Sequence, residues 1–184
     1  MLSIDRLSLD YQARYCEENV WRLLAHSDLE ARRVWAVIVS SPSGHFAALR
    51  QRAGRPRDGL VCWDYHVFAV VDDADGTRLA LDLDSALPFP CPLALYLAES
   101  FPATPHQRQR PIFRVIAAAD YLTGLASDRS HMRKPDGSYF APPPPWPAPG
   151  EGKSNTLMAW IDVSCNLPGV LYDLVLIYDF AAGF

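Results

Sequence analysis

Lysine is scarce in this sequence, and basic residues as a whole are outnumbered by acidic ones. The 17 lysines and arginines stand against 21 aspartates and glutamates, which gives a formal net charge of −4 at pH 7. The basic side chains are not gathered into a dense stripe, so the sequence lacks the charge pattern by which proteins bind a phosphate backbone. We therefore expect no nucleic-acid partner.

Long hydrophobic runs are absent as well. The longest apolar stretches, such as residues 34–39 and 115–119, are far shorter than the roughly 20 residues that a membrane-spanning helix needs. Residues 1–6 alternate apolar and charged side chains, a pattern that the apolar core of a signal peptide does not contain. We expect a protein that lies in the cytoplasm and has no membrane partner.

Cysteine motifs are also missing, although the chain has four cysteines. Cys16, Cys62, Cys91 and Cys165 form neither a CxxC metal pattern nor the framework of a disulfide-rich domain. The zinc motif HExxH, the phosphate-binding loop and the dinucleotide motif GxGxxG do not occur either. We expect reduced thiols, and a protein that needs neither a metal ion nor an organic cofactor.

What is present indicates one folded unit of mixed structure. The 184 residues are a usual length for one domain and enough to bury a core, so we expect a single domain over residues 1–184. Periodicity predicts helices over residues 16–26 and 93–100. Glu17 and Glu18 suit the first turn of the former helix, where the helix dipole favours acidic side chains.

Strands are predicted from apolar and β-branched runs at residues 34–40, 46–50, 60–71, 77–83 and 112–118. The run at 46–50 is interpreted as the strand that returns beside 34–40. Strands and helices that occur in runs, rather than in strict alternation, predict an α+β fold. Residues 157–180 contain further apolar runs and are expected to complete the core.

The strongest strand signal, over residues 60–83, predicts an antiparallel hairpin with ionisable side chains on one face. A turn centred on Ala74 places His66 opposite Asp82, within hydrogen-bonding reach. A register shifted by two residues places His66 opposite Asp84 instead, and the spacing favours Asp82 without excluding Asp84. A carboxylate beside a histidine fixes its tautomer and stabilises its cation.

A plain pair on the sheet surface is the simplest interpretation of His66 and its aspartate. The strands that carry them are strongly apolar, however, and ionisable groups on such strands need a purpose. In the favoured register Asp64 also faces Asp84, and these like charges repel unless a cation or a proton lies between them. These residues are therefore interpreted as part of a site.

Cys16 is the candidate nucleophile because it begins the predicted helix. The free N–H groups and the dipole of a helix N-terminus stabilise a thiolate and predict a lowered pKa for Cys16. The same N–H groups can bind an oxyanion. Cys62 is the competitor on the strand of His66, but no helix terminus activates it. Cys62, Cys91 and Cys165 are expected to be small core hydrophobes.

Two loop segments have simpler interpretations. His131 follows a run of polar residues and can in principle act as a base, but we expect it to stabilise its own loop. Residues 142–147 are rich in proline, which restricts them to extended conformations. We expect this segment to pack across its own domain rather than to serve as a docking ligand.

The order of cysteine, histidine and aspartate resembles the papain-like fold in its transglutaminase-type arrangement. We therefore expect a cysteine-bearing N-terminal helix packed on a mainly antiparallel sheet with flanking helices. In detail, the sequence resembles the protein N-terminal glutamine amidohydrolase family. The matching stretches cover residues 15–21, 55–59, 63–67, 82–91, 113–116, 126–132 and 142–147. The resemblance fades in residues 25–50 and after residue 150.

This resemblance implies a catalytic triad of Cys16, His66 and Asp82, and thereby the choice of Asp82 over Asp84. It implies that the side-chain amide of an N-terminal glutamine in a protein or peptide is hydrolysed through a Cys16 thioester, with release of ammonia. It implies a monomer without a cofactor. It further implies a degradation pathway, the N-degron pathway, in which the new N-terminal glutamate marks proteins.

Restriction to an N-terminal residue requires a group that binds an α-ammonium. Asp64, with help from Asp84, is our hypothesis for that contact. Two alternatives stay open: a deamidase or transglutaminase-type enzyme that acts on internal glutamine, and an N-terminus-binding module without turnover. The set of Cys16, His66 and Asp82 argues against the module, because a binding protein needs no nucleophile.

Overall fold

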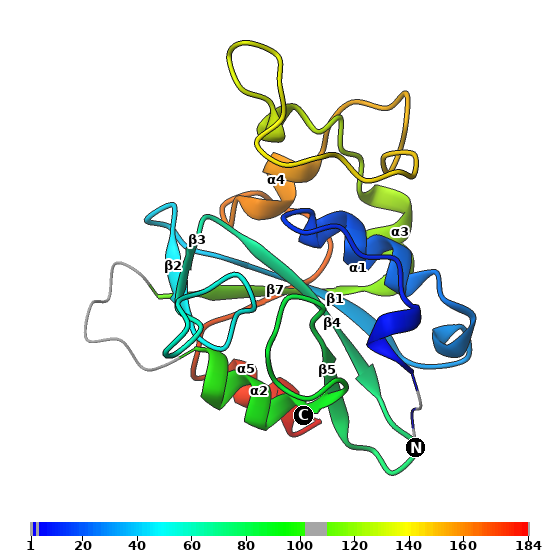
Figure 1. Ribbon diagram of the computed structural model, residues 1–184. Coiled ribbons are helices and arrows are strands. Elements are labelled where there is room, and N and C mark those ends of the chain that lie inside the picture. The colour runs from blue at the N-terminus through cyan, green and yellow to red at the C-terminus, as the bar shows by residue number, and fades with distance from the viewer. Residues whose placement is uncertain (1, 3, 102–109, 184) are drawn as a thin grey trace.

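A six-stranded sheet forms the centre of the protein in a computed structural model, which describes residues 2, 4–101 and 110–183 (Figure 1). Its strand order is β6-β5-β4-β1-β7-β8, and every neighbouring pair runs antiparallel. These strands are β1 Val34–Ser40, β4 His66–Asp72, β5 Arg78–Leu81, β6 Cys91–Pro92, β7 Ile112–Ala117 and β8 Val170–Tyr172. The expected α+β class with a mainly antiparallel sheet is confirmed.

Helices cover both faces of this sheet. In Figure 1, α1, α3 and α4 lie on one side of it, and α2 and α5 lie on the other. Their bounds are α1 Cys16–Leu24, α2 Leu93–Ser100, α3 Ala118–Gly124, α4 Leu157–Ile161 and α5 Ile177–Ala181. Short 3-10 helices are η1 Arg6–Ser8, η2 Ser27–Leu29 and η4 Ser130–Met132. No helix in the described part of the chain is long and apolar enough to cross a membrane.

The central strands are apolar without interruption because both of their faces are buried. Ala36 and Ile38 of β1 face the core under α1, whereas Val37 and Val39 face the core over α2. Such a strand alternates between two cores rather than between core and solvent. This explains the continuous apolar run by which the sequence predicted residues 34–40.

The predicted strand over residues 60–71 is in fact two strands. β3 (Val61–Trp63) pairs with β2 (Phe46–Ala48) in a separate two-stranded sheet, and β4 begins at His66. Between them, the Asp64 carboxylate accepts a hydrogen bond from the N–H of Tyr65, which takes that N–H out of a strand ladder. The expectation that residues 46–50 return beside β1 is therefore wrong.

The register of the predicted hairpin is also wrong by two residues. Ala69 pairs with Leu81, whereas a turn centred on Ala74 would have paired it with Leu79. The turn is instead closed by a hydrogen bond from the N–H of Asp73 to the carbonyl of Thr77. The turn is therefore centred one residue later than predicted.

The strand ends decide which aspartate reaches His66. Because β5 ends at Leu81, Asp82 and Asp84 both lie beyond the ladder, and the shifted register does not place Asp84 opposite His66. Asp64 lies outside a strand as well, so the predicted cross-strand pair of Asp64 and Asp84 does not form. The side chain that bonds His66 is nevertheless Asp82.

The cysteines and the C-terminal runs depart in part from expectation. Cys62 is exposed on β3 rather than buried, while Cys91 is buried and Cys165 is half-buried; all four thiols are free. In residues 157–180, the buried side chains are those of the helices, Leu157, Trp160, Ile177 and Phe180. The stretch between them is a short edge strand and loop, so Val170, Leu171, Val175 and Leu176 are exposed.

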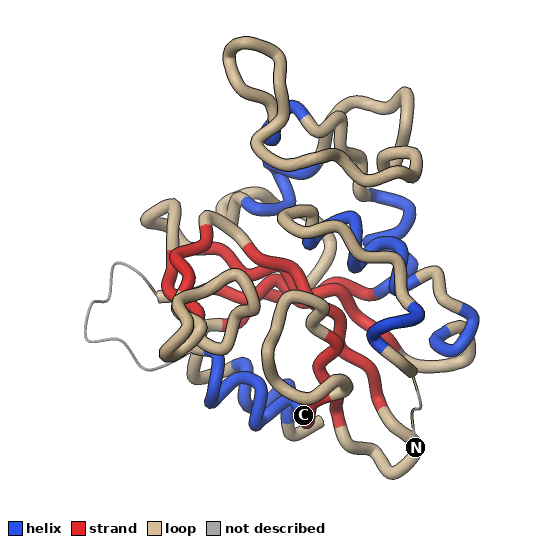
Figure 2. Tube along the Cα trace, in the orientation of Figure 1, coloured by secondary structure: helices blue, strands red, loops and turns tan. Residues whose placement is uncertain are grey.

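Residues 125–156 run mostly as loop over the side of the sheet that carries α1 (Figure 2). The proline-rich segment in this loop packs against its own domain, as expected. Its carbonyl groups at Pro144 and Trp146 accept hydrogen bonds from Arg129, and the indole N–H of Trp146 donates to Glu18 of α1. This loop forms one wall of the site described next.

Packing of α1 on the sheet is expected to dominate the stability of this face. Leu23 is only 2% exposed, so we expect Leu23→Ala to lower the free energy of unfolding by about 2–5 kcal/mol through lost burial and a cavity. Leu7 is 91% exposed and serves as a control, for which Leu7→Ala should change stability by less than about 0.5 kcal/mol. Urea unfolding of both variants measures this, and equal losses would contradict the packing described.

Candidate active site

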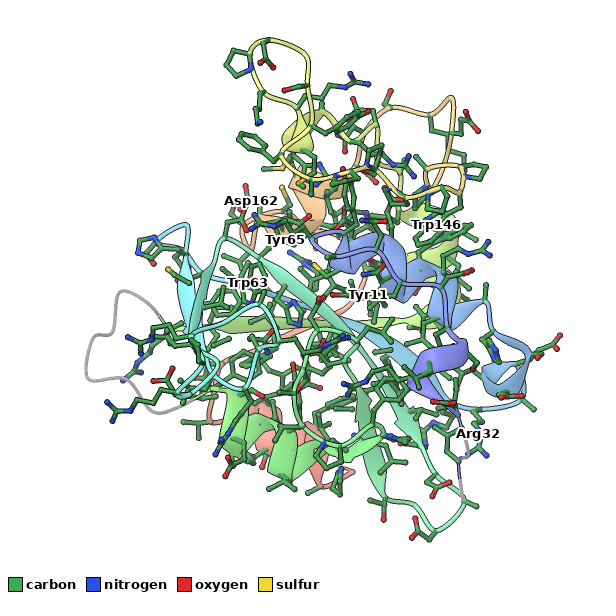
Figure 3. The ribbon with its side chains drawn as sticks, in the orientation of Figure 1. Tyr11, Arg32, Trp63, Tyr65, Trp146 and Asp162 are labelled. Carbon is green, nitrogen blue, oxygen red and sulfur yellow. The ribbon has the colours of Figure 1, made fainter. Side chains whose placement is uncertain are left out.

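A pocket of about 260 Å³ opens beside the first residue of α1. Its lining residues are Arg14, Cys16, Trp63, Asp64, Tyr65, His66, Asp84, His131, Met132 and Phe140. The structure therefore brings Cys16, His66, Asp64 and Asp84 together from separate parts of the chain. Figure 3 shows Trp63 and Tyr65 on the side of the sheet where the helix begins. A larger hollow of about 770 Å³ lies at the other end of α1 and contains none of these residues.

Cys16 occupies the helix terminus that the sequence predicts. It is the first residue of α1, and the preceding residue, Tyr15, provides no side-chain hydrogen bond to cap the helix. The first amide groups of a helix have no partner within the helix itself. The N-terminus of α1 thus offers N–H groups beside the Cys16 sulfur.

His66 and Asp82 form a hydrogen bond in the dry interior, which confirms their predicted contact. The distance from His66 Nε2 to Asp82 Oδ2 is 3.1 Å, and both side chains are 1% exposed. Asp82 also accepts hydrogen bonds from the hydroxyl of Tyr96 at 2.8 Å and from the N–H of Asp84 at 2.9 Å. The Trp63 ring stacks on the imidazole. The imidazole is therefore held in place on several sides.

The charges of this pair shift both of its pKa values. Burial by itself lowers the pKa of His66, but the charge and hydrogen bond of Asp82 outweigh it, so the pKa is raised. Burial likewise opposes ionisation of Asp82, and His66 outweighs it, so the pKa of Asp82 is lowered. Asp84 differs, because burial and the neighbouring Asp82 charge raise its pKa.

The pKa of Cys16 contradicts the sequence-based expectation. Burial, followed by the charges of Glu17 and Asp84, raises the pKa of the thiol well above its ordinary value. A backbone hydrogen bond from Val67 acts in the opposite direction but does not compensate. The expected lowering considered the helix terminus alone, whereas burial of the sulfur, and after it the neighbouring carboxylates, have the larger effect.

Glu17 is one residue whose place the sequence did not reveal. It is 0% exposed, and its Oε2 accepts a hydrogen bond from the Tyr65 hydroxyl at 2.9 Å. The same oxygen lies 3.8 Å from Cys16 Sγ, and Oε1 lies 3.4 Å from His131 Nε2. His131 therefore lines the pocket and contacts Glu17 and Tyr65, so the expectation that it only stabilises its own loop is wrong.

Glu18 is buried as well and anchors the loop wall. Its carboxylate accepts two hydrogen bonds of 2.7 Å from Arg129, together with the bond from Trp146, which Figure 3 labels beside α1. Arg129 adopts a left-handed backbone conformation with φ of 58°. A paired geometry of this kind fixes orientation as well as distance. The ion pair of Glu18 and Arg129 thus ties the segment that carries His131 to α1, two residues after Cys16.

Comparison of the sequence with known proteins assigns the chain to a family. The sequence profile of N-terminal glutamine amidase matches residues 11–180, which is nearly the whole chain. The chain belongs to this family. The resemblance predicted from the sequence is confirmed.

Three curated relatives in the family are each named Protein N-terminal glutamine amidohydrolase. The Bos taurus protein is 39% identical over 153 residues, which cover 79% of this chain and 73% of that protein. The Homo sapiens protein is 39% identical over 153 residues, covering 79% and 74%. The Drosophila willistoni protein is 40% identical over 173 residues, covering 89% and 84%.

Of the two buried glutamates that the sequence analysis did not identify, only Glu17 could have been found from a sequence pattern. Glu17 precedes Val20 by three residues and Leu24 by seven, so helical periodicity places it on the apolar, buried side of α1. Glu18 has no such signal, because its partner Arg129 is 111 residues away in the chain. Long-range ion pairs of this kind arise only from the tertiary fold.

Metal binding has no candidate site among residues 2, 4–101 and 110–183. No group of three or more histidine, cysteine, aspartate or glutamate side chains in these segments is arranged to hold a metal ion. His106 belongs to the residues outside this description. The Asp84 carboxylate at the pocket accepts a hydrogen bond from the hydroxyl of Tyr11, at 2.6 Å from Oδ1.

The pair of His66 and Asp82 predicts a stability that depends on pH. Because the pKa of Asp82 is lowered on folding, its contribution is present above the unfolded value of about 3.9 and is lost as pH falls through the folded pKa. Because the pKa of His66 is raised, its contribution is complete below about 6.5 and is lost as pH rises through the folded pKa. Asp82→Asn should therefore lower the free energy of unfolding by about 3 kcal/mol between those two pH limits, and by less outside them.

Urea unfolding over a series of pH values measures this difference. The control is the solvent-accessible pair of His26 and Asp28, in which His26 Nδ1 lies 3.7 Å from Asp28 Oδ2. Asp28→Asn should change the free energy of unfolding by less than about 0.5 kcal/mol at every pH. A loss in Asp82→Asn that stays constant across the pH range would contradict the ionic character of the buried pair.

Proposed function

We propose that this protein hydrolyses the side-chain amide of an N-terminal glutamine to glutamate and ammonia, with Cys16 as nucleophile. The observation that carries the proposal is the shared pocket of Cys16 and His66, whose Nε2 is bonded to Asp82. Membership of the N-terminal glutamine amidase family, together with the names of the relatives, supports the substrate and the reaction.

The bond to Asp82 determines the chemical role of each imidazole nitrogen. Nε2–H donates to the carboxylate, so Nδ1 carries the lone pair that can accept the Cys16 proton. Asp82 then stabilises the imidazolium, and the hydroxyl of Tyr96 keeps the carboxylate oriented. In this scheme Tyr96 is a positioning residue that acts through Asp82.

Acylation begins when the Cys16 thiolate attacks the carboxamide carbon of the substrate. The carbonyl electrons move onto oxygen, and N–H groups at the uncapped start of α1 stabilise the oxyanion. As the carbonyl re-forms, the C–N bond breaks and His66 gives its proton to the departing ammonia. The product of this half-reaction is a thioester between Cys16 and the substrate side chain.

Deacylation returns the enzyme to its starting state. His66 removes a proton from water, and the resulting hydroxide attacks the thioester carbon. A second tetrahedral intermediate collapses with cleavage of the C–S bond, and the sulfur recovers a proton from His66. The released residue is an N-terminal glutamate, so one water is consumed for each ammonia formed.

Asp64 is proposed to bind the α-ammonium of the substrate. It is exposed at the wall of the pocket that contains Cys16, and it has no ion pair among the described residues. Asp84 lines the same pocket and is proposed to assist, but Tyr11 already donates to it and burial raises its pKa. An ammonium group donates up to three hydrogen bonds, so two carboxylates can share it.

The same proposal includes a monomer that works in the cytoplasm, without a nucleic-acid or membrane partner. A single chain supplies all the residues that line the pocket, which supports a site that functions in one protomer. The four free thiols suit a reducing compartment. The net charge of −4 supports the absence of a nucleic-acid partner.

Ammonia release tests the proposed reaction directly. We expect release from a short peptide that begins with glutamine, and none from its acetylated form or from an isomer with an internal glutamine. Cys16→Ala should lower the rate by roughly 10⁴-fold or more, because the nucleophile is lost. Release from all three peptides would instead indicate a general deamidase. Tight binding of the first peptide without any release would indicate a binding module.

Replacement of Asp64 tests the ammonium contact. Asp64→Asn should raise KM for the N-terminal glutamine peptide about 10-fold or more, because a charge-assisted hydrogen bond is lost. Asn retains the oxygen that accepts the N–H of Tyr65, so the fold should persist. The matched control is Asp75→Asn, at an exposed turn where the carboxylate accepts the N–H of Thr77. An unchanged KM in Asp64→Asn would eliminate this contact.

A further inference from the structure

The carboxylate of Glu17 is a buried anion in contact with the nucleophile. Its polar contacts are the Tyr65 hydroxyl at 2.9 Å, the His131 imidazole at 3.4 Å and the Cys16 sulfur at 3.8 Å. Among the described residues it has no ion pair with a lysine or an arginine. One of its oxygens, Oε1, also lacks a hydrogen-bond donor in this part of the chain. A buried carboxylate this poorly compensated needs a specific explanation.

Other groups around Cys16 add to the negative charge. Asp82 and Asp84 follow β5, and Asp64 precedes β4 on the wall of the same pocket. From α3, Tyr121 donates to the backbone carbonyl of Glu17 and brings no charge.

Positive charge near Cys16 is limited by comparison. The cation of His66, when it forms, is already matched by Asp82. Arg14 is exposed at the pocket wall, and Arg129 is paired with Glu18. Without a bound substrate, the charges around the pocket therefore disfavour ionisation of the Cys16 thiol.

We propose that Glu17 makes the nucleophile depend on a cationic substrate: its carboxylate keeps Cys16 protonated in the free enzyme, and the α-ammonium of a bound N-terminal residue offsets that charge. The thiol proton then passes from Cys16 Sγ to His66, and no other bond changes in this step. This inference rests on the proposed function, because the ammonium enters the pocket as part of the glutamine substrate.

In this proposal, Asp64 and Glu17 favour a substrate with a free N-terminus at two separate steps. Asp64 selects it in binding, and Glu17 selects it in the formation of the thiolate. A substrate with a blocked N-terminus brings no positive charge, so it leaves the sulfur protonated even when it binds. The raised pKa of the Cys16 thiol, caused by burial and then by Glu17, agrees with this geometry.

His131 is the group that can modify this effect. Its Nε2 lies 3.4 Å from Glu17, so a protonated imidazole offsets part of the carboxylate charge, and a neutral imidazole leaves it intact. The field of Glu17 on Cys16 is thus strongest when His131 is neutral.

The first test compares two substrates that differ only in the α-amine. One is a glutamine-initiated peptide, and the other is the same peptide with hydrogen in place of that amine. For Glu17→Gln, we expect the ratio of their kcat/KM values to fall at least about 10-fold from wild type, because the uncharged peptide gains rate. Gln keeps an oxygen for the Tyr65 hydroxyl while it removes the charge. Glu151→Gln, in an exposed loop, is the matched control.

An unchanged ratio in Glu17→Gln would overturn the proposal. If both kcat/KM values fell by the same factor, the ratio would also be unchanged, and Glu17 would have only a structural role. Absence of ammonia release from both peptides in the wild-type enzyme would instead contradict the proposed function. The second test, which needs no turnover by the variant, separates these cases.

The second test measures alkylation of Cys16 by iodoacetamide as a function of pH. Mass spectrometry of the digested protein distinguishes Cys16 from the exposed Cys62, which serves as an internal reference. In Glu17→Gln, the midpoint for Cys16 should move down by about one pH unit or more, which gives roughly 10-fold more thiolate at a fixed pH. A midpoint that does not move would overturn the proposal whether or not the enzyme is active.

The wild-type protein provides a further check if Glu17→Gln does not fold. The pH dependence of kcat reports ionisations of the substrate complex, whereas alkylation reports those of the free enzyme. We expect the acidic limb of kcat for the glutamine peptide to lie about one pH unit or more below the alkylation midpoint of Cys16. Coincident midpoints would show that the substrate does not activate the sulfur and would overturn the proposal.

Discussion

The hydrogen bond between His66 and Asp82 is the interaction on which the site depends. Both side chains lie in the dry interior, where an unpaired charge would cost several kcal/mol. The buried Asp82 carboxylate therefore requires further hydrogen-bond donors, and Tyr96 of α2 and the N–H of Asp84 supply them. Elements from different parts of the chain thus fix the position of one imidazole, which lines the same pocket as Cys16.

A second set of buried acidic groups lies beside Cys16, the proposed nucleophile. Glu17 and Glu18 follow Cys16 directly, and each turns toward residues of the loop between α3 and α4. Loops are usually the more mobile parts of a protein, but the ion pair of Glu18 and Arg129 fastens this one to α1. The acidic character of the pocket then gives a common physical basis to the proposed binding of an ammonium group and to the proposed control of the Cys16 thiol.

Periodicity and turn chemistry predicted the elements that carry the site. The start of α1 at Cys16, the strand that contains His66 and the second helix at residues 93–100 all follow from local patterns. The contact between His66 and Asp82 was also predicted, although through a hairpin register that is wrong by two residues. The contact forms because β5 ends at Leu81, so the backbone beyond it is free to turn the next side chain toward the imidazole.

The sequence by itself determined the α+β class, the cysteine at a helix terminus and the family, because each of these depends on residues that are close in the chain or on a motif in fixed order. Only the tertiary structure decided the strand break after Trp63, the burial of Glu17 and Glu18, and the raised pKa of the Cys16 thiol. These features depend on which distant segments exclude water from a given atom. A local pattern reports the neighbours of a residue along one element, whereas burial and charge are set by the whole fold.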